Sequence, residues 1–268
     1  MTKQKPVTVA TLRRLKQQGE KFACLTAYDA SFATLVDEAG VDVILVGDSL
    51  GMVVHGRDDT VAVTVDDIVY HSRCVARGRQ RALLMADMPF MSYATAEQAL
   101  ANAARLMQEG GAHAVKLEGG AAQVDTVRLL SERGIPVCAH LGLQPQFVHR
   151  LGGYKVQGRE VEAAQRMRRD AQALQEAGAD LLLLESVPRT LAADITREVA
   201  LPVIGIGAGS CCDGQILVLY DMLGVTPGHR PRFTHDFLDE EGTVPAALRA
   251  YVAAVKSGCF PGPEHGFD

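Results

Sequence analysis

Val43-Ile44-Leu45-Val46-Gly47-Asp48-Ser49 is an apolar run that stops at a glycine and two polar residues, and this arrangement indicates the fold. Strands of a parallel sheet are buried on both faces, so they read as continuous apolar runs of this kind. Similar runs recur along the chain, and nearly every one ends in a polar or glycine-rich cluster: around residue 25, at 83–85, around 115, and at 136–138, 181–184, 203–204 and 216–219. The pattern predicts eight buried parallel strands.

Apolar residues at helical spacing fill the intervals between these runs. Predicted helices cover residues 32–39, 99–107, 161–174 and 191–199, and the second follows a capping-box pattern of Thr95 and Gln98. Three helices end alike, each with a glycine as the expected stop: Glu38-Ala39-Gly40, Glu109-Gly110-Gly111 and Glu176-Ala177-Gly178. Strands that alternate with helices imply βαβ units. We therefore expect an α/β protein whose residues 1–268 form a single (β/α)8 TIM barrel, with an N-terminal helix around residues 12–16 closing the barrel bottom.

The composition restricts the function classes. A chain of 268 residues is close to the usual size of one such barrel. The net charge is −5 with both signs scattered, which provides no basic footprint for nucleic acid. No apolar run approaches the length of a membrane-spanning helix, and the first six residues lack the apolar stretch of a secretory signal. We therefore expect neither a nucleic-acid nor a membrane partner.

The cysteines indicate a reduced environment. Six are present and none forms a CxxC pair, which is typical of a cytoplasmic protein. The adjacent Cys211 and Cys212 leave a redox site as a weaker alternative.

Three carboxylates form the sharpest group of candidate site residues. Asp48, Asp87 and Glu118 each follow or end an apolar strand, and in a (β/α)8 barrel the C-terminal strand ends carry the active site. Three hard oxygen donors at one barrel mouth suit Mg²⁺, which takes one or two protein carboxylates plus water and substrate oxygens. Helix N-caps or structural ion pairs are the alternative interpretation of each residue alone.

Further polar residues occupy neighbouring strand ends. Lys116 is two positions before Glu118, so period-two geometry places both side chains on the barrel interior, where Lys116 can balance carboxylates or bind an anionic substrate. Glu185 ends the most apolar strand and is a candidate general base or a partner for an arginine. His140 is either a substrate hydrogen-bond partner or a satisfied core histidine. The glycines of 205–209 suit either phosphate binding or close packing.

Two connections are long for a compact barrel, at residues 51–63 and 141–159. Long loops are often lids or binding segments. Contacts between subunits of an oligomer are an equally good interpretation.

Taken together, long blocks of this sequence resemble one family, ketopantoate hydroxymethyltransferase. The resemblance spans nearly the whole chain and is carried by blocks in the same order: Thr26-Ala27-Tyr28-Asp29, Val46-Gly47-Asp48-Ser49-Leu50-Gly51-Met52, Asp87-Met88-Pro89-Phe90-Met91, Lys116-Leu117-Glu118-Gly119-Gly120, His140-Leu141-Gly142-Leu143, Gly152-Gly153-Tyr154-Lys155-Val156-Gln157-Gly158-Arg159 and Pro202-Val203-Ile204-Gly205-Ile206-Gly207-Ala208-Gly209. Departures, such as Ser186 after Glu185 and the run Ser210-Cys211-Cys212, touch no matched catalytic position.

The resemblance implies transfer of a hydroxymethyl group from 5,10-methylenetetrahydrofolate to 3-methyl-2-oxobutanoate, in pantothenate and coenzyme A synthesis. It implies Mg²⁺ held by Asp48 and Asp87, with Glu118 in its shell, and a proton acceptor at Glu185. The substrate-binding positions fall on Asp48, Ser49, Asp87, Lys116 and His140. The resemblance leaves the folate-binding residues unassigned. It also implies a homo-oligomer, typically a decamer.

Two other functions fit parts of the pattern. A Mg²⁺-dependent carbon–carbon lyase or phosphoenolpyruvate mutase-like barrel would share 2-oxo acid chemistry without folate, although such enzymes usually carry a reactive loop cysteine that has no match here. An inactive barrel kept as an oligomeric scaffold would have no need for the full set of charged strand-end residues.

Overall fold

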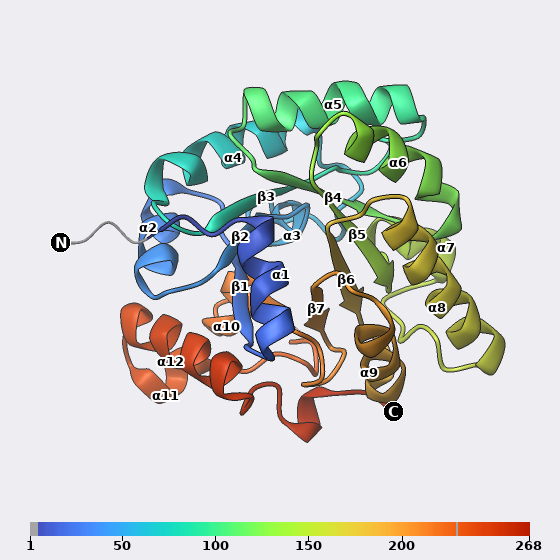
Figure 1. Cartoon of the computed structure of the whole chain (residues 1–268). Coiled ribbons are helices and arrows are strands. Elements are labelled where there is room, and N and C mark those ends of the chain that lie inside the picture. Colours follow the sequence, from blue (N-terminus) through green and yellow to red (C-terminus); the bar gives the residue numbers. More distant parts are fainter. Residues whose placement is uncertain (1–4, 229) are drawn as a thin grey trace.

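Eight parallel strands form a closed barrel in chain order (Figure 1). The structure is a computed structural model, and it describes residues 5–228 and 230–268. The strands are β1 (Phe22–Thr26), β2 (Val43–Val46), β3 (Leu83–Asp87), β4 (Ala114–Glu118), β5 (Val137–Gly142), β6 (Leu181–Glu185), β7 (Val203–Ile206) and β8 (Gly214–Leu217). The predicted (β/α)8 barrel is confirmed.

The last strand differs from its prediction. The apolar run at residues 216–219 indicates a strand, but β8 begins at Gly214 and ends at Leu217. Leu219 already lies in the short helix α10 (Leu219–Met222) and is fully buried there. Apolar runs cannot separate a buried strand from the buried first turn of the helix that follows it.

Helices surround the barrel (Figure 1). Apart from α10, the helices are α1 (Val9–Gln18), α2 (Ala30–Glu38), α3 (Leu50–Val53), α4 (Val65–Gly78), α5 (Ala96–Gln108), α6 (Val124–Glu132), α7 (Val148–Leu151), α8 (Val161–Glu176), α9 (Arg189–Glu198), α11 (Phe237–Glu241) and α12 (Val244–Ser257), with 3₁₀ turns η1 (Ala121–Gln123), η2 (Pro145–Phe147) and η3 (Pro263–His265). The three predicted glycine stops lie just beyond α2, α5 and α8, and all have positive φ. The capping box at α5 is half formed, because Thr95 caps the Gln98 amide while the Gln98 side chain bonds Ala94.

Helix α1 closes the N-terminal end of the barrel, as predicted. It lies across the barrel axis in Figure 1, and Leu12 at its centre is fully buried. Arg13 pairs with Asp180 at 2.6 Å and Lys16 with Asp213 at 2.8 Å. Asp180 and Asp213 directly precede β6 and β8, so these pairs fix the helix against the strand starts. The opposite end of the barrel is left for the active site.

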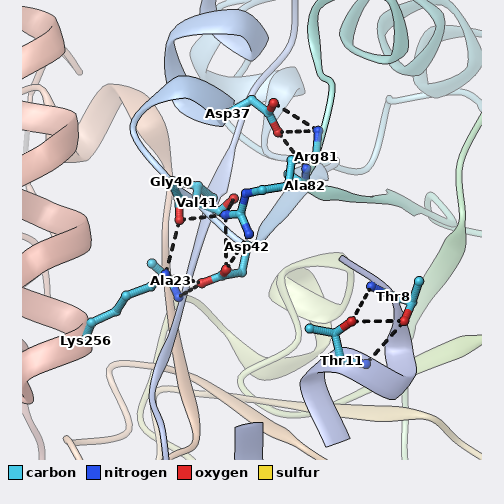
Figure 2. Close-up of polar contacts among 10 residues, drawn as sticks. All are labelled: Thr8, Thr11, Ala23, Asp37, Gly40, Val41, Asp42, Arg81, Ala82 and Lys256. Carbon is cyan, nitrogen blue, oxygen red and sulfur yellow. Dashed lines mark hydrogen bonds and ion pairs between the residues drawn. The ribbon is translucent and has the colours of Figure 1, made fainter. Parts of the chain in front are cut away.

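A polar network joins the first three strands at the same end (Figure 2). The Arg81 guanidinium lies 3.1 Å from Asp42 Oδ1 and donates to the carbonyls of Gly40 and Val41. The other Asp42 oxygen accepts from the Ala23 amide. Lys256 of α12 approaches that oxygen to 3.0 Å. These buried charges are compensated in place, as burial of an ion requires.

The connection from β7 to β8 is unlike the others. In the described chain, residues 207–213 contain no helix. The C-terminal segment packs there instead, with Phe267 paired to Pro188 in a parallel bridge. A Cβ atom added to Gly207 would approach the rings of Phe233 and Phe267 to 2.8 and 3.1 Å. Gly207 therefore permits close packing of aromatic rings, one of the predicted roles of the glycines of 205–209.

Candidate active site

Charged side chains from five consecutive strands gather at the C-terminal end of the barrel. Asp48 lies two residues after β2, Asp87 ends β3, Lys116 and Glu118 lie on β4, His140 lies on β5 and Glu185 ends β6. The strand register places Asp87 opposite Lys116 and Glu118 opposite His140. All except Glu185 are at most 4% exposed. The structure thus brings together six of the seven site residues predicted from sequence.

Lys116 lies at the centre of this cluster. Its Nζ is 2.6 Å from Asp87 Oδ1 and 3.9 Å from Glu118 Oε1. The expected orientation of Lys116 and Glu118 toward the same face is confirmed. Burial opposes the charged form of Lys116, but the carboxylates of Asp87, Glu118 and Asp48 outweigh it and raise the pKa of the ammonium. Lys116 is therefore a permanent buried cation.

His140 connects the cluster to Glu185. Its Nδ1 lies 3.4 Å from Glu118 Oε1, and its Nε2 lies 3.3 Å from Glu185 Oε2. Burial and Lys116 oppose a charge on the ring, but the nearby carboxylates of Glu118 and Glu185 favour it and raise the pKa of His140 to about 9. Its Nδ1 also lies 3.4 Å from Lys116 Nζ, so the ring bridges the buried lysine and the Glu185 carboxylate.

Asp48 and Asp87 lie in an environment short of positive charge. Burial raises the pKa of Asp48, and the carboxylates of Asp87 and Glu118 raise it further. Burial also raises the pKa of Asp87, although Lys116 acts in the opposite direction. The Asp48 amide donates to Asp87 Oδ2 at 3.0 Å, which holds the two residues together. The alternative interpretation, a structural ion pair, explains the contact of Asp87 with Lys116. It leaves the negative charge of Asp48 uncompensated.

This charge deficit fits a divalent cation. Glu118 Oε1 is buried and accepts no hydrogen bond within the described structure. Within the same residues, no group of three or more His, Cys, Asp or Glu side chains is arranged to hold a metal ion unaided. Mg²⁺ needs only one or two protein carboxylates when water and substrate oxygens complete its shell. Asp48 and Asp87 fit that pattern.

Ser49 and Glu185 lie at the edges of the cluster. Ser49 Oγ lies 2.9 Å from the Tyr28 hydroxyl. The side chain of Glu185 is 15% exposed, so it faces the open part of the mouth. Ser186 follows with φ of +48°, a left-handed conformation that is unusual outside glycine. Its amide bonds the Ile206 carbonyl and its carbonyl accepts from the Gln157 amide, which fixes the backbone directly after Glu185.

Two residues of the site were not predicted from sequence. Gln146 of η2 donates from Nε2 to Asp48 Oδ2 at 2.9 Å, and its backbone amide donates to Glu118 Oε2 at 3.1 Å. Tyr93, in the loop after β3, donates to Gln146 Oε1 at 2.5 Å. Both side chains come from loops, where no periodicity indicates a buried position. The only signal was the length of the segment that carries Gln146.

The two long loops meet each other at this end of the barrel. His149 Nε2 lies 3.0 Å from Asp59 Oδ2, and the Tyr154 hydroxyl lies 3.4 Å from Met52 Sδ. Burial raises the pKa of Tyr154, and the charges of Asp59, Glu185 and Asp48 raise it further. The contacts between the loops fit a covering role, and contact between subunits of an oligomer stays the alternative interpretation.

Of the adjacent pair Cys211 and Cys212, only Cys211 is exposed. Cys212 is buried, and that burial raises the pKa of its thiol to about 12. A reactive cysteine needs an accessible thiolate, which Cys212 lacks. No helix in residues 5–228 or 230–268 has the length and apolarity needed to cross a membrane.

The fold and the site define a (β/α)8-barrel enzyme with a buried lysine–carboxylate cluster at its C-terminal mouth. The family model described as ketopantoate hydroxymethyltransferase matches residues 6–263. The 3-methyl-2-oxobutanoate hydroxymethyltransferase of Alkalilimnicola ehrlichii is 64% identical over 263 residues, which cover 98% of this chain and 95% of that one. The enzyme of the same name from Halorhodospira halophila is 61% identical over 262 residues, covering 98% and 95%. The chain therefore belongs to the ketopantoate hydroxymethyltransferase family and is a transferase.

Solved structures of lower similarity share the fold. A 2,3-dimethylmalate lyase, described as a member of the PEP mutase/isocitrate lyase superfamily, superimposes with a TM-score of 0.60 at 17% identity, over 97% of this chain and 98% of that one. Phosphonopyruvate hydrolase in complex with oxalate and Mg²⁺ gives a TM-score of 0.61 at 17% identity, covering 96% and 92%. At these identities the likeness concerns the barrel alone.

Proposed function

We propose that this enzyme transfers the one-carbon unit of 5,10-methylenetetrahydrofolate to 3-methyl-2-oxobutanoate and forms ketopantoate. The observation that carries the proposal is the joint placement of Asp48, Asp87 and Lys116 at the mouth, with Glu185 linked to them through His140. The two aspartates can hold a metal ion that binds a 2-oxo acid, and Lys116 can add positive charge. A separate carboxylate, Glu185, can remove the proton of the 2-oxo acid. Membership of the family supports this choice of substrate.

Asp48 and Asp87 are the proposed metal ligands, with Glu118 in the surrounding shell. When bound, Mg²⁺ would supply positive charge for the carboxylate and keto oxygens of the 2-oxo acid and make its C3 proton more acidic. The solved complex of phosphonopyruvate hydrolase with oxalate and Mg²⁺ is an example of a barrel of this fold that holds Mg²⁺ together with a dicarboxylate.

The remaining residues provide binding and proton transfer. Ser49 and the surrounding backbone would bind the substrate carboxylate, and Lys116 adds positive charge where the keto oxygen becomes negative. Glu185 would accept the proton from C3, because it is the exposed carboxylate of the cluster and His140 orients it. C3 then forms the new carbon–carbon bond with the methylene carbon of the folate. One bond from the methylene carbon to a folate nitrogen breaks as the carbon–carbon bond forms, and that nitrogen would receive the proton taken by Glu185. Water then replaces the second nitrogen: its OH stays on the carbon as the hydroxymethyl group, its other proton goes to the nitrogen, and tetrahydrofolate leaves. His140 would lie near the hydroxymethyl group.

The loops at 51–63 and 141–159 would exclude other water during this reaction. Carbanion chemistry needs an oriented substrate in a dry site, and the Tyr154–Met52 and His149–Asp59 contacts place both loops at the mouth. We further propose that residues 1–268 form one catalytic domain. We also propose that the enzyme is cytoplasmic and forms a homo-oligomer, the decamer typical of the family.

The direct test is product formation from 3-methyl-2-oxobutanoate and 5,10-methylenetetrahydrofolate, with Mg²⁺ and with EDTA. We expect ketopantoate only when the metal is present. Turnover of the 2-oxo acid without folate would instead favour a carbon–carbon lyase. Absence of all turnover in folded, Mg²⁺-supplied protein would favour a scaffold.

A further inference from the structure

Gln146 is a buried amide whose hydrogen-bonding groups are all engaged at the site. It is 2% exposed, although it comes from the short turn η2 that follows β5. Its Nε2 donates to Asp48 Oδ2 at 2.9 Å and to the Met88 carbonyl at 3.0 Å. Its Oε1 accepts from the Tyr93 hydroxyl, and its backbone amide donates to Glu118 Oε2. One loop residue thereby contacts two of the three proposed metal-site carboxylates.

The Met88 carbonyl and the Tyr93 hydroxyl together determine which way the amide points. The carbonyl can only accept, so it requires the NH₂ group of Gln146 on the side that also faces Asp48. The Tyr93 hydroxyl accepts from the Glu118 backbone amide at 3.3 Å and donates its own proton to Gln146 Oε1 on the other side. A flipped amide would place Oε1 against the Met88 carbonyl and the Asp48 carboxylate and lose both of those bonds.

We propose that Gln146, oriented by Tyr93, is a positioning residue that holds the Asp48 carboxylate in place for metal binding. The bond to Oδ2 restrains rotation of the carboxylate and leaves the Oδ1 atom of Asp48 for the cation. The inference rests on the metal site proposed above. Partners of this kind behind a metal ligand typically change metal affinity by about 10- to 100-fold.

The same bonds tie the covering loop to the metal site. Gln146 lies two residues before α7, which leads into the segment that carries Tyr154, so movement of that segment away from the mouth would pull on the Asp48 and Glu118 contacts. Metal affinity and loop position are then coupled through one side chain. If Gln146 served only to fill space, its bonds to Asp48 and Glu118 would not be needed.

The test is Mn²⁺ binding to the substrate-free enzyme, followed by electron paramagnetic resonance of the unbound ion. Gln146→Met keeps the length and volume of the side chain and removes its polar atoms. We expect its Kd for Mn²⁺ to rise about 10- to 100-fold. Tyr93→Phe removes the donor to Gln146 Oε1 while the Met88 and Asp48 acceptors still engage the NH₂ group, so it should raise the Kd by a smaller factor. Gln144→Met, two residues earlier in the same loop, is the matched control and should bind as the wild type does.

A second readout separates positioning from general damage. At saturating Mn²⁺ the kcat of Gln146→Met should recover most of the wild-type value, while the half-saturating metal concentration stays raised. An unchanged Kd in folded Gln146→Met, or an equal loss in Gln144→Met, would overturn the inference. If Gln146→Met does not fold, an unchanged Kd for Mn²⁺ in Tyr93→Phe is sufficient to overturn the inference. Wild-type protein that binds no Mn²⁺ would reject the proposed metal site and this inference together, whereas normal wild-type binding without ketopantoate formation would reject only the proposed reaction.

Discussion

Lys116 Nζ lies 2.6 Å from Asp87 Oδ1, and neither side chain is more than 5% exposed. The pair joins the ends of β3 and β4 beneath the other carboxylates of the mouth. Removing one partner of a buried pair leaves an uncompensated charge, which costs more than the pair itself contributes. The relationship therefore predicts that Lys116 contributes to stability in addition to its proposed role in the chemistry.

Replacing Lys116 should reveal both roles. We expect Lys116→Met to lower the free energy of unfolding by about 3 kcal/mol at neutral pH, because Asp87 and Glu118 lose their buried cation. Urea unfolding, followed by circular dichroism, measures this change. Lys116→Arg should retain more stability because the charge is kept. Equal stability of Lys116→Met and the wild type would mean that the carboxylates are neutral in the folded protein.

Glu185 can be tested separately from the folate half of the reaction. We expect Glu185→Gln to lower kcat by about 10²- to 10⁴-fold, the usual contribution of a general base. Exchange of the C3 proton of 3-methyl-2-oxobutanoate with deuterated water, followed by NMR, should fall in parallel because it reports proton removal alone. Glu198→Gln, an exposed carboxylate paired with Arg168, should exchange normally. Wild-type exchange in Glu185→Gln would assign the base elsewhere.

The loop contacts predict an effect on substrate binding rather than on chemistry. Removing the His149–Asp59 contact with His149→Ala should raise the KM for the folate several-fold and leave kcat nearly unchanged. The contact is partly exposed, so the energy involved is about 1 kcal/mol or less. Hydrogen exchange of residues 149–159 should become faster in the variant. Unchanged exchange there would show that the two loops hold their positions independently.

His113 predicts a pH dependence of stability. Its Nδ1 accepts from the Leu84 amide, and its Nε2 lies 2.8 Å from an Arg79 nitrogen. Burial lowers the pKa of His113, and the Arg79 charge lowers it further. The unfolded chain then binds the proton more readily, so this contribution is complete above the ordinary pKa of about 6.5 and is lost as the pH falls below it. We expect the unfolding free energy of His113→Gln to decline less steeply than that of the wild type between pH 7 and 5, as measured by urea titration at each pH.

The network at the barrel bottom predicts a stability effect without a catalytic one (Figure 2). Arg81→Met removes the guanidinium from Asp42, which is 5% exposed, and should cost about 3 kcal/mol. Lys256 remains near Asp42 and limits the loss. Arg105→Met is the matched control, since Arg105 also contacts two carboxylates but at the exposed surface. Thermal unfolding should separate the two variants, while the KM of the folded Arg81→Met protein stays normal.

The barrel and most of the site follow from the sequence alone. Burial on both faces makes each strand a continuous apolar run, so the charged residues that end these runs, such as Asp87 and Glu185, identify the active-site end. The two-residue period of a strand likewise places Lys116 and Glu118 on one face. These features are local, because each depends only on the burial of a short segment.

Which of these groups touch, and which loop residues join them, depends on the tertiary structure. The choice of Asp87 over Glu118 as the close partner of Lys116 rests on strand register, which no single segment encodes. Gln146 and Tyr93 lie in loops, where the chain has no periodicity and polar residues are expected at the surface. They are buried because segments distant in sequence pack around them, and that packing exists only when the barrel is closed.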